Sequence, residues 1–278
     1  MTNQGNPKQI KNEHTLLQAK VHAKLAFAGC ENCKLNCCEG KRFDHAGIFL
    51  SEVQDAAKLF PVIFKEIDKK LEMRYVFSIK KGVPCPYLDP GSKKCTVYDQ
   101  GRPLFCRIYP FSFKFKVMRG SVQHPTISFD SRCTGLQESE EGIQILTDDG
   151  ELSEEIFASF FDSEIVAKYE AHLHVTDKFL KLVAELDLLT REKMIFINKS
   201  LTGKGYDVEL DVLKISEQKL AALDADSKMR LQTAGYYINV INAHLNSLSN
   251  YQRLYQALTA VEKPRQSICS ILPSDVKS

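Results

Sequence analysis

The sequence contains no segment that would take the chain into or across a membrane. It has no apolar stretch of about 18 residues, the length that indicates a membrane-spanning helix. Its longest charge-free run, residues 231–252, is rich in Asn, Gln, Ser and Thr. The first residues are polar and lack the apolar core of a signal peptide. We therefore expect a cytoplasmic protein that does not associate with a membrane.

The sequence also lacks the short motifs of several common enzyme classes. It contains no Ser–His–Asp elbow motif, no phosphate-binding P-loop and no HExxH motif. Residues 30–133 are basic, with 18 Lys and Arg against 11 Asp and Glu, whereas residues 134–278 are acidic, with 15 against 23. The basic residues form no dense run, so mutual attraction of the two halves explains this asymmetry better than a nucleic-acid surface does. We expect no nucleic-acid partner.

Cysteine is the residue type whose distribution bears most directly on function. Of the nine cysteines, all but Cys269 lie between residues 30 and 133. A disulfide framework is not expected in a reducing compartment, so clustered thiols indicate metal or redox chemistry. The candidate metal ligands are Cys30, Cys33, Cys37, Cys38, Cys85, Cys95, Cys106 and Cys133.

These eight cysteines fall into two blocks of four. In the first block, the spacing of Cys30 and Cys33 lets two thiolates bind one ion from a single tight turn. Cys37 and Cys38 follow directly, and the second block extends over residues 85–133. Two centres of four thiolates each would use all eight cysteines. The alternative is a single cluster, with the remaining cysteines in structural or redox roles. Zinc and iron–sulfur clusters both accept four thiolates, and neighbouring aromatic side chains slightly favour an iron–sulfur cluster such as 4Fe–4S.

Three further residues are candidates for a role near these thiols, and the ninth cysteine is not. Arg107 follows Cys106 and is positioned to donate hydrogen bonds to cluster sulfurs, although an ordinary surface arginine fits equally well. His45 and His124 are weaker candidates for nitrogen ligands, because unattached surface histidines are more common. Cys269 lies in a tail rich in Ser and is not expected to take part.

The pattern of elements predicts an α+β fold, in which a small cysteine-rich metal module of short strands and loops precedes an all-helical bundle. Alternating apolar and polar residues predict strands at 75–79, 111–117 and 126–129. Pro- and Gly-rich segments predict loops that carry the cysteines. The expected organisation is an N-terminal tail with a short helix (1–29), a cysteine-rich metal-binding domain (30–135), an acidic linker (136–152) and a helical domain (153–278).

Apolar residues at helical spacing place several helices in this organisation. The expected helices are 51–73 with a break at Pro61, 153–172, 176–189, 208–223 and 227–262. The last carries a heptad stripe from Leu231 to Tyr255, which fits a helix of an antiparallel bundle better than a dimer seam. We expect the helical half to bind a protein partner or a second copy of the chain.

The cysteine motifs resemble those of the YkgJ-like cysteine-cluster family. The matching segments are Cys30-x2-Cys33-x3-Cys37-Cys38, Cys85-Pro86-Tyr87-Leu88, Cys95-Thr96-Val97-Tyr98 and Arg102-Pro103-x2-Cys106-Arg107-x-Tyr109-Pro110-Phe111. The resemblance covers about residues 30–133 and implies a domain that chelates zinc or iron.

The same pattern is similar to that of the flagellin lysine N-methylases, which implies an alternative function. Those enzymes are associated with an iron–sulfur cluster and S-adenosylmethionine. This chain lacks the C-x3-C-x2-C order of ordinary radical enzymes that use that cofactor, and it lacks a glycine-rich methyltransferase signature. We therefore expect a protein that binds an iron–sulfur cluster or zinc through up to eight thiolates, with a cluster-dependent protein lysine N-methylase as the alternative.

Overall fold

The computed structural model forms two compact units, each assembled from two separate stretches of the chain. Unit 1 consists of residues 1–36 and 92–175, and unit 2 of residues 37–91 and 176–278. The structure describes residues 25–27, 37–98, 102–114, 117–118, 121–122, 126–130, 133–139, 143–145, 147, 153–155, 163–197, 207–233 and 237–267.

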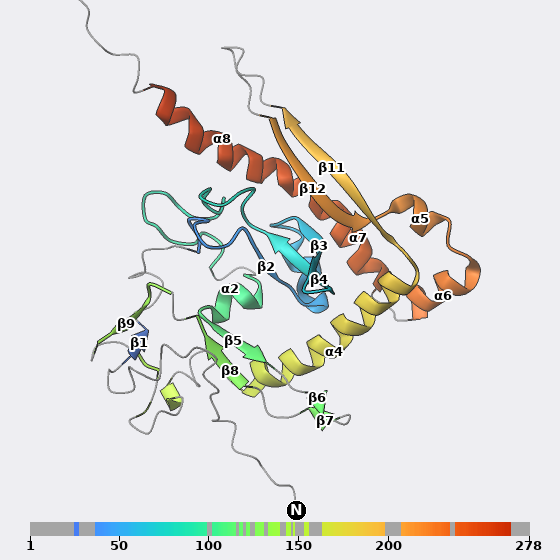
Figure 1. The fold of residues 1–278 in the computed structure, drawn as a ribbon, viewed down its shortest axis with the longest axis horizontal. Coiled ribbons are helices and arrows are strands. Elements are labelled where there is room, and N and C mark those ends of the chain that lie inside the picture. The colour runs from blue at the N-terminus through green and yellow to red at the C-terminus, as the bar shows by residue number, and fades with distance from the viewer. Residues whose placement is uncertain are drawn as a thin grey trace, which may run out of the picture. The chain divides into compact units, whose positions relative to one another are not determined.

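Unit 2 is built on a five-stranded antiparallel sheet with the strand order β11-β12-β3-β4-β2 (Figure 1). Its strands are β2 (His45–Gly47), β3 (Val62–Ile67), β4 (Lys70–Val76), β11 (Leu189–Ile197) and β12 (Asp207–Ile215). β11 and β12 pair along their whole length, whereas β12 pairs with β3 at a single position, Leu213 opposite Phe64. Other groups must therefore hold β12 and β3 together along the rest of their contact.

A two-residue turn joins β3 to β4. Its residues, Asp68 and Lys69, have φ angles of 50° and 63°, which match the right-handed twist of a tight hairpin. The first half of β3, residues 62–64, consists of β-branched and aromatic side chains and is buried. The prediction that a helix continues from Pro61 to Met73 is therefore wrong, because this segment forms a hairpin instead.

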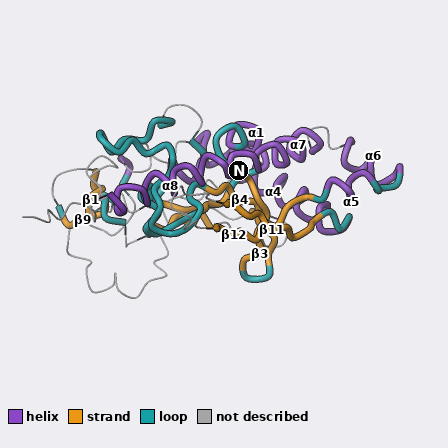
Figure 2. Tube along the Cα trace, turned by 90° about the horizontal axis from the view of Figure 1, so that it is seen from above, coloured by secondary structure: helices purple, strands orange, loops and turns teal. Residues whose placement is uncertain are grey.

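The helices of unit 2 come from both of its stretches, and α7 and α8 pack against the sheet. The elements are η1 (Leu50–Glu52), α1 (Val53–Ala56), α5 (Glu217–Ala221), α6 (Ala225–Thr233), α7 (Tyr237–Ser247), η2 (Leu248–Asn250) and α8 (Tyr251–Ser267), and α4 (Ser163–Glu185) enters the unit at Thr176. α7 and α8 follow one another beside the sheet (Figure 2). One core cluster joins α8 to strands β3, β4 and β12 through Ile63, Val76, Val212, Tyr251, Leu254 and Leu258.

A buried histidine on α7 bridges β3 and β12 where the two strands are not paired. The imidazole of His244 is fully buried. Its Nδ1 lies 2.8 Å from the carbonyl oxygen of Val62, and its Nε2 lies 3.1 Å from the backbone nitrogen of Ile215. Ile215 donates to Nε2, so the neutral ring carries its proton on Nδ1 and donates it to Val62. Burial lowers the pKa of His244 to about 4, against the small opposing effect of this hydrogen bond.

Unit 1 contains three small antiparallel sheets and a short helix. β1 (Leu25–Phe27) lies between β10 (Ile143–Gln144) and β9 (Leu136–Glu138), β5 (Phe111–Lys114) pairs with β8 (Thr126–Phe129), and β6 (Val117–Met118) pairs with β7 (Ser121–Val122). α2 (Leu104–Ile108) precedes β5. Phe111 contacts both Phe27 and Phe129 edge to face, at ring-centroid distances of 6.3 and 6.4 Å. This aromatic contact joins two of the sheets.

The predicted fold class is wrong. The chain is a mixed α/β protein with antiparallel sheets, and the described residues form no cysteine-rich metal module. The expected all-helical second half contains the β11–β12 hairpin, which pairs with a strand from the first half. The first half of the expected helix at 208–223 is strand β12 and residues 217–221 form helix α5, and the expected helix at 227–262 is divided among α6, α7, η2 and α8.

Other predicted elements agree with the structure or fall partly outside it. The strand expected at 126–129 is β8, and the strand expected at 111–117 is described as β5 followed by β6. Thr176 was expected to begin a helix, but it lies inside α4, and its hydroxyl oxygen accepts a hydrogen bond from the backbone of Leu50 at 2.9 Å. Of the short helix expected in the N-terminal segment, only residues 25–27 are described, and they form strand β1.

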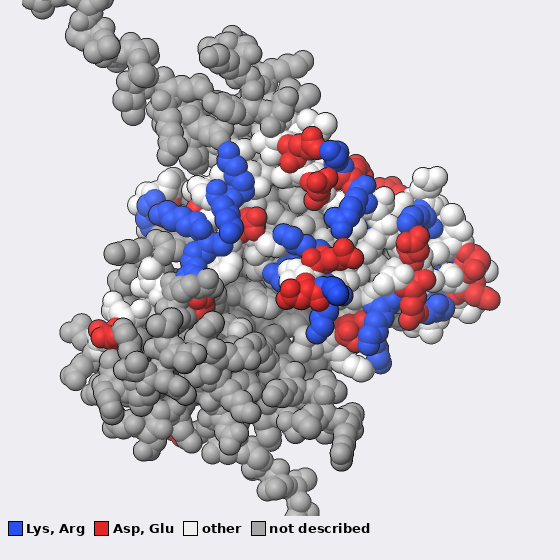
Figure 3. Space-filling model, viewed as in Figure 1, with Lys and Arg blue, Asp and Glu red and all other residues white. Residues whose placement is uncertain are grey.

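Charges of both signs lie side by side on the described surface of unit 2 (Figure 3). Ion pairs link the strands of this sheet: Lys193 with Glu209 and Lys214 with Glu192 between β11 and β12, and the exposed Arg191 of β11 with Glu66 of β3. Such exposed pairs each contribute at most about 1 kcal/mol to stability. Among the described residues, no helix combines the length and the apolar character that a membrane span needs.

Candidate functional site

Three cysteines of unit 2 lie on two loops that hydrogen-bond to each other through their backbones. Cys37 and Cys38 begin the turn 37–40, and the backbone nitrogen of Cys85 donates to the carbonyl oxygen of Cys38 at 2.7 Å. A second bond runs from the nitrogen of Gly82 to the oxygen of Gly40 at 2.9 Å. All three cysteines are half-buried and carry thiols rather than disulfides. We call Cys37, Cys38 and Cys85 the thiol junction.

Glycine at position 40 is a steric requirement of this junction. Gly40 has a φ of +68°, a conformation that side chains rarely adopt. A Cβ atom there would lie 2.0 Å from the carbonyl oxygen of Val83, which is backbone and cannot move aside as a side-chain end would. The close approach of the two loops therefore depends on the absence of a side chain.

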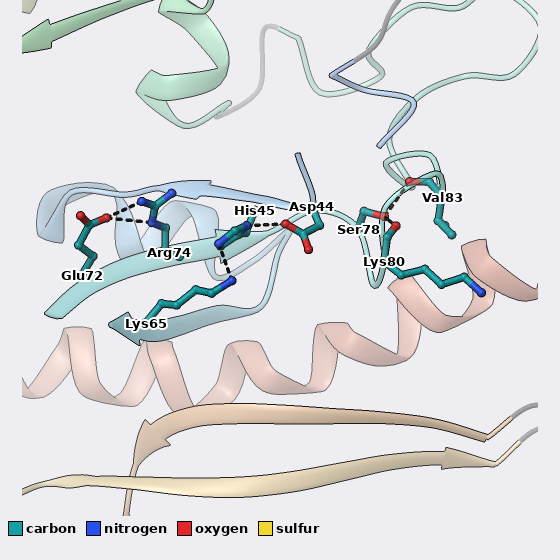
Figure 4. Close-up of polar contacts among 8 residues, drawn as sticks. All are labelled: Asp44, His45, Lys65, Glu72, Arg74, Ser78, Lys80 and Val83. Atoms are coloured by element: carbon teal, nitrogen blue, oxygen red, sulfur yellow. Dashed lines mark hydrogen bonds and ion pairs between the residues drawn. The ribbon is translucent and has the colours of Figure 1, made fainter. Parts of the chain in front are cut away.

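The loop that carries Cys85 is fixed to the sheet by buried polar contacts. The hydroxyl of Ser78 lies 2.8 Å from the carbonyl oxygen of Lys80 and 2.7 Å from that of Val83 (Figure 4). The backbone nitrogens of Phe77 and Ser78 both donate to the carbonyl oxygen of Asp44 at 3.0 Å. The junction is thus attached to the ends of β4 and β2.

A tyrosine and an arginine lie next to Cys85. The hydroxyl of Tyr87 donates to the carbonyl oxygen of Leu59 at 2.9 Å and accepts a hydrogen bond from the guanidinium of Arg253 on α8. Burial raises the pKa of Tyr87, the negative charge of Cys85 adds to this effect, and Arg253 opposes it. The phenol and the thiol are therefore electrostatic neighbours, and Arg253 supplies a positive charge beside them.

In unit 1, one arginine connects the two segments that carry Cys95 and Cys106. The backbone nitrogen of Tyr98 donates to the carbonyl oxygen of Cys95 at 3.3 Å. Arg102 donates to the carbonyl oxygens of Tyr98 at 3.0 Å and Cys106 at 3.4 Å, and its guanidinium stacks 3.4 Å from the centre of the Tyr98 ring. Arg102 therefore fixes the loop of Cys95 against the helix of Cys106.

Cys133 is linked to the end of the same helix by Asp130. The backbone nitrogen of Asp130 donates to Pro110 at 2.9 Å, and the Tyr109 hydroxyl lies 3.3 Å from the Asp130 carboxylate. Cys133 then closes a turn onto the carbonyl oxygen of Asp130 at 2.9 Å. Arg107, proposed to support a cluster, is exposed in the last turn of α2.

The prediction of an assembled cysteine cluster is wrong for the part of the chain that the structure describes. Within that part, no group of three or more Cys, His, Asp or Glu side chains is arranged to hold a metal ion. Within the described residues, the expected classification as a metal-binding zinc, iron–sulfur or 4Fe–4S protein therefore lacks support. Cys30, Cys33, His124 and Cys269 lie outside the described residues. Both ring nitrogens of His45 contact other side chains, so the weaker possibility that it is a nitrogen ligand has no support in this geometry.

Fold and site together define a mixed α/β protein of two units, each carrying cysteines on hydrogen-bonded loops. The family model of SapC matches residues 17–254, which is most of the chain. The chain therefore belongs to the SapC family. The resemblance to the YkgJ-like cysteine-cluster family, and with it the implied chelating domain, was wrong. No solved structure matches the chain.

Sequence reasoning missed the residues that position the thiol junction. Tyr87 was noted only as part of the Cys-Pro-Tyr-Leu motif, and the structural requirement for Gly40 was not recognised. Arg253 reaches Tyr87 from a helix 166 residues away in sequence, and no local signal indicates that contact. Ser78 lies within the strand predicted at 75–79, where a buried hydroxyl bonding two carbonyl groups cannot be inferred from periodicity.

Proposed function

We propose that the protein acts through reversible oxidation of the thiol junction, in which Cys85 forms a disulfide with Cys38. The observation that carries this proposal is the 2.7 Å backbone hydrogen bond between these two residues. This bond makes the two residues direct neighbours, and a disulfide needs Cα atoms about 5–6 Å apart. The half-buried thiols remain accessible to a small oxidant.

The redox step is thiol–disulfide exchange with a low-molecular-weight disulfide. One junction thiolate attacks a sulfur of that disulfide, forms a mixed disulfide and releases one small thiol. The second junction thiolate then attacks the protein sulfur and releases the other small thiol. Two electrons pass from the junction to the small disulfide, and the two protons of the junction thiols end on the released thiols. The product joins the turn 37–40 covalently to the loop 82–85.

The proposal is tested by equilibrating the full chain in glutathione buffers of graded redox potential. Remaining thiols are blocked with N-ethylmaleimide, and the peptides are mapped by mass spectrometry. We expect the linked peptides to join Cys38 to Cys85, and we expect Cys38→Ser or Cys85→Ser to abolish this link. Cys37→Ser is the matched control, because it removes the adjacent thiol and should leave the link intact. A link that uses Cys37, or a Cys85 that forms only glutathione adducts, would contradict the proposed pairing.

The expected binding of zinc or an iron–sulfur cluster through as many as eight thiolates also stays a proposal. The cysteines of the described segments do not by themselves supply three ligands, so a metal site would need Cys30 and Cys33. Their C-x2-C spacing, shortly before the junction in sequence, supports it. Anaerobic purification followed by assays of iron, sulfide and zinc tests it, and metal-free protein under these conditions would contradict it. The methylase alternative depended on the family resemblance and gains no support from the described residues.

A further inference from the structure

Unit 2 contains a chain of three side chains, Asp44, His45 and Lys65, at the edge of its sheet (Figure 4). One carboxylate oxygen of Asp44 lies 2.5 Å from Nδ1 of His45. Nε2 of the same ring lies 2.7 Å from Nζ of Lys65. The three residues come from the start of β2 and from β3, and the proposed function does not use them.

The chemistry of the two outer groups determines the tautomer of the central ring. A lysine ammonium has donors and no acceptor, so Nε2 must present its lone pair to Lys65. Nδ1 then carries the proton and donates it to Asp44. Consistent with this, the hydrogen bond from His45 is the largest influence that lowers the pKa of Asp44. A carboxylate thus orients an imidazole whose free lone pair faces an amine, which is the arrangement by which a base activates a nucleophile.

The contact between Lys65 and His45 is not the one that strand register would favour. Lys65 lies directly opposite Glu72 in the β3–β4 pairing, and opposite charges at such positions usually pair. Instead, the carboxylate of Glu72 binds Arg74, with its oxygen 3.0 Å from Nε and 2.5 Å from a terminal nitrogen. The amine of Lys65 is therefore available to the imidazole.

Backbone hydrogen bonds fix Asp44 and His45 in place, while the amine of Lys65 stays accessible to solvent. The carbonyl oxygen of Asp44 accepts hydrogen bonds from Phe77 and Ser78, and His45 pairs with Val76 across β2 and β4. The side chain of His45 is 20% exposed, whereas Lys65 is an exposed residue. A small reagent can thus reach the amine, and the base beside it keeps a fixed position.

We propose that Asp44, His45 and Lys65 form an acyl-acceptor site, in which Lys65 is the nucleophile for an activated acyl group such as an ester or thioester. The Lys65 ammonium first passes one proton through His45 to solvent, which leaves a neutral amine. The amine attacks the acyl carbon and forms the C–N bond. His45 takes the second proton and gives it to the leaving oxygen or sulfur as the C–O or C–S bond breaks. Asp44 is a positioning residue that stabilises the imidazolium.

The test compares two lysines within the same folded molecule. Lys58 is the matched control, because it is exposed and pairs with a carboxylate, Asp55, at 2.6 Å without a histidine. The full chain is treated with limiting p-nitrophenyl acetate, and hydroxylamine then removes acetyl groups from thiols. Mass spectrometry gives the acetylation rates of both lysines. Positioned bases contribute roughly 10²- to 10⁴-fold in enzymes, and we expect Lys65 to react at least about tenfold faster than Lys58 at this exposed site.

Two variants separate base catalysis from simple exposure. His45→Gln removes the base and should lower the rate at Lys65 to that at Lys58, while Lys58 itself is unchanged. Asp44→Asn keeps the backbone contacts and removes the charge. It should therefore lower the ratio of the Lys65 rate to the Lys58 rate part of the way toward one. Equal rates in the wild type, or a ratio that survives His45→Gln, would overturn the proposal. If His45→Gln does not fold, the wild-type ratio and the Asp44→Asn variant decide.

Discussion

The buried histidine of α7 should make unit 2 sensitive to mild acid. The pKa of His244 falls from 6.5 to about 4 on folding, because burial penalises the charged ring. Between these values the unfolded chain binds a proton at this position and the folded chain does not. Stability is therefore fully present above about pH 6.5 and falls as the pH drops toward 4. The complete shift corresponds to about 3 kcal/mol, of which about 2 kcal/mol is lost by pH 5.

Urea unfolding at pH 7.5 and pH 5 measures this contribution. Other groups also titrate in this range, so the informative quantity is the difference between the wild type and His244→Gln. A glutamine amide can donate to Val62 and accept from Ile215, as the imidazole does, but it does not titrate. We expect the wild type to lose about 2 kcal/mol more than this variant between the two pH values.

An exposed histidine provides the matched control for this measurement. His174 is exposed on α4, so His174→Gln should retain the wild-type loss of stability. Equal losses in the wild type and His244→Gln would refute the reasoning. That result would mean that His244 accepts a proton without unfolding, and that the contact between β3 and β12 tolerates a charged ring.

Two further substitutions test the thiol junction, each by urea unfolding. Gly40→Ala brings a Cβ against the carbonyl oxygen of Val83 and should destabilise the protein by about 2 kcal/mol or more. Gly82→Ala is the control, because Gly82 has a φ of +85° but open space around it, and it should cost only about 1 kcal/mol. Equal effects would contradict the steric argument. Tyr87→Phe removes the hydrogen bonds to Leu59 and from Arg253 and should destabilise by about 1 kcal/mol or more, and an unchanged midpoint would mean that these contacts contribute nothing.

Local sequence pattern was sufficient for some elements and insufficient for others. The alternation in residues 126–129 predicted β8, because side chains on a half-buried strand alternate whatever the strand pairs with. Residues 207–215 also alternate, with Val208, Leu210 and Val212 on one face, yet a helix was expected there. β12 is a strand because β11 pairs with all nine of its residues, a partner that its own sequence does not specify.

The sequence by itself determined that the thiols of this protein are concentrated, and that most of them lie outside helices and strands. Composition and the spacing of Pro and Gly depend only on neighbouring residues, so these features can be read directly. Only the tertiary structure decided which cysteines lie next to each other. It divides the cysteines between two units and sets Cys85 against Cys38 rather than beside Cys95, because a backbone hydrogen bond joins loops that are 47 residues apart in sequence. The same long-range pairing of strands β2, β3 and β4 brings Lys65 to His45, a contact that neither residue's sequence neighbours predict.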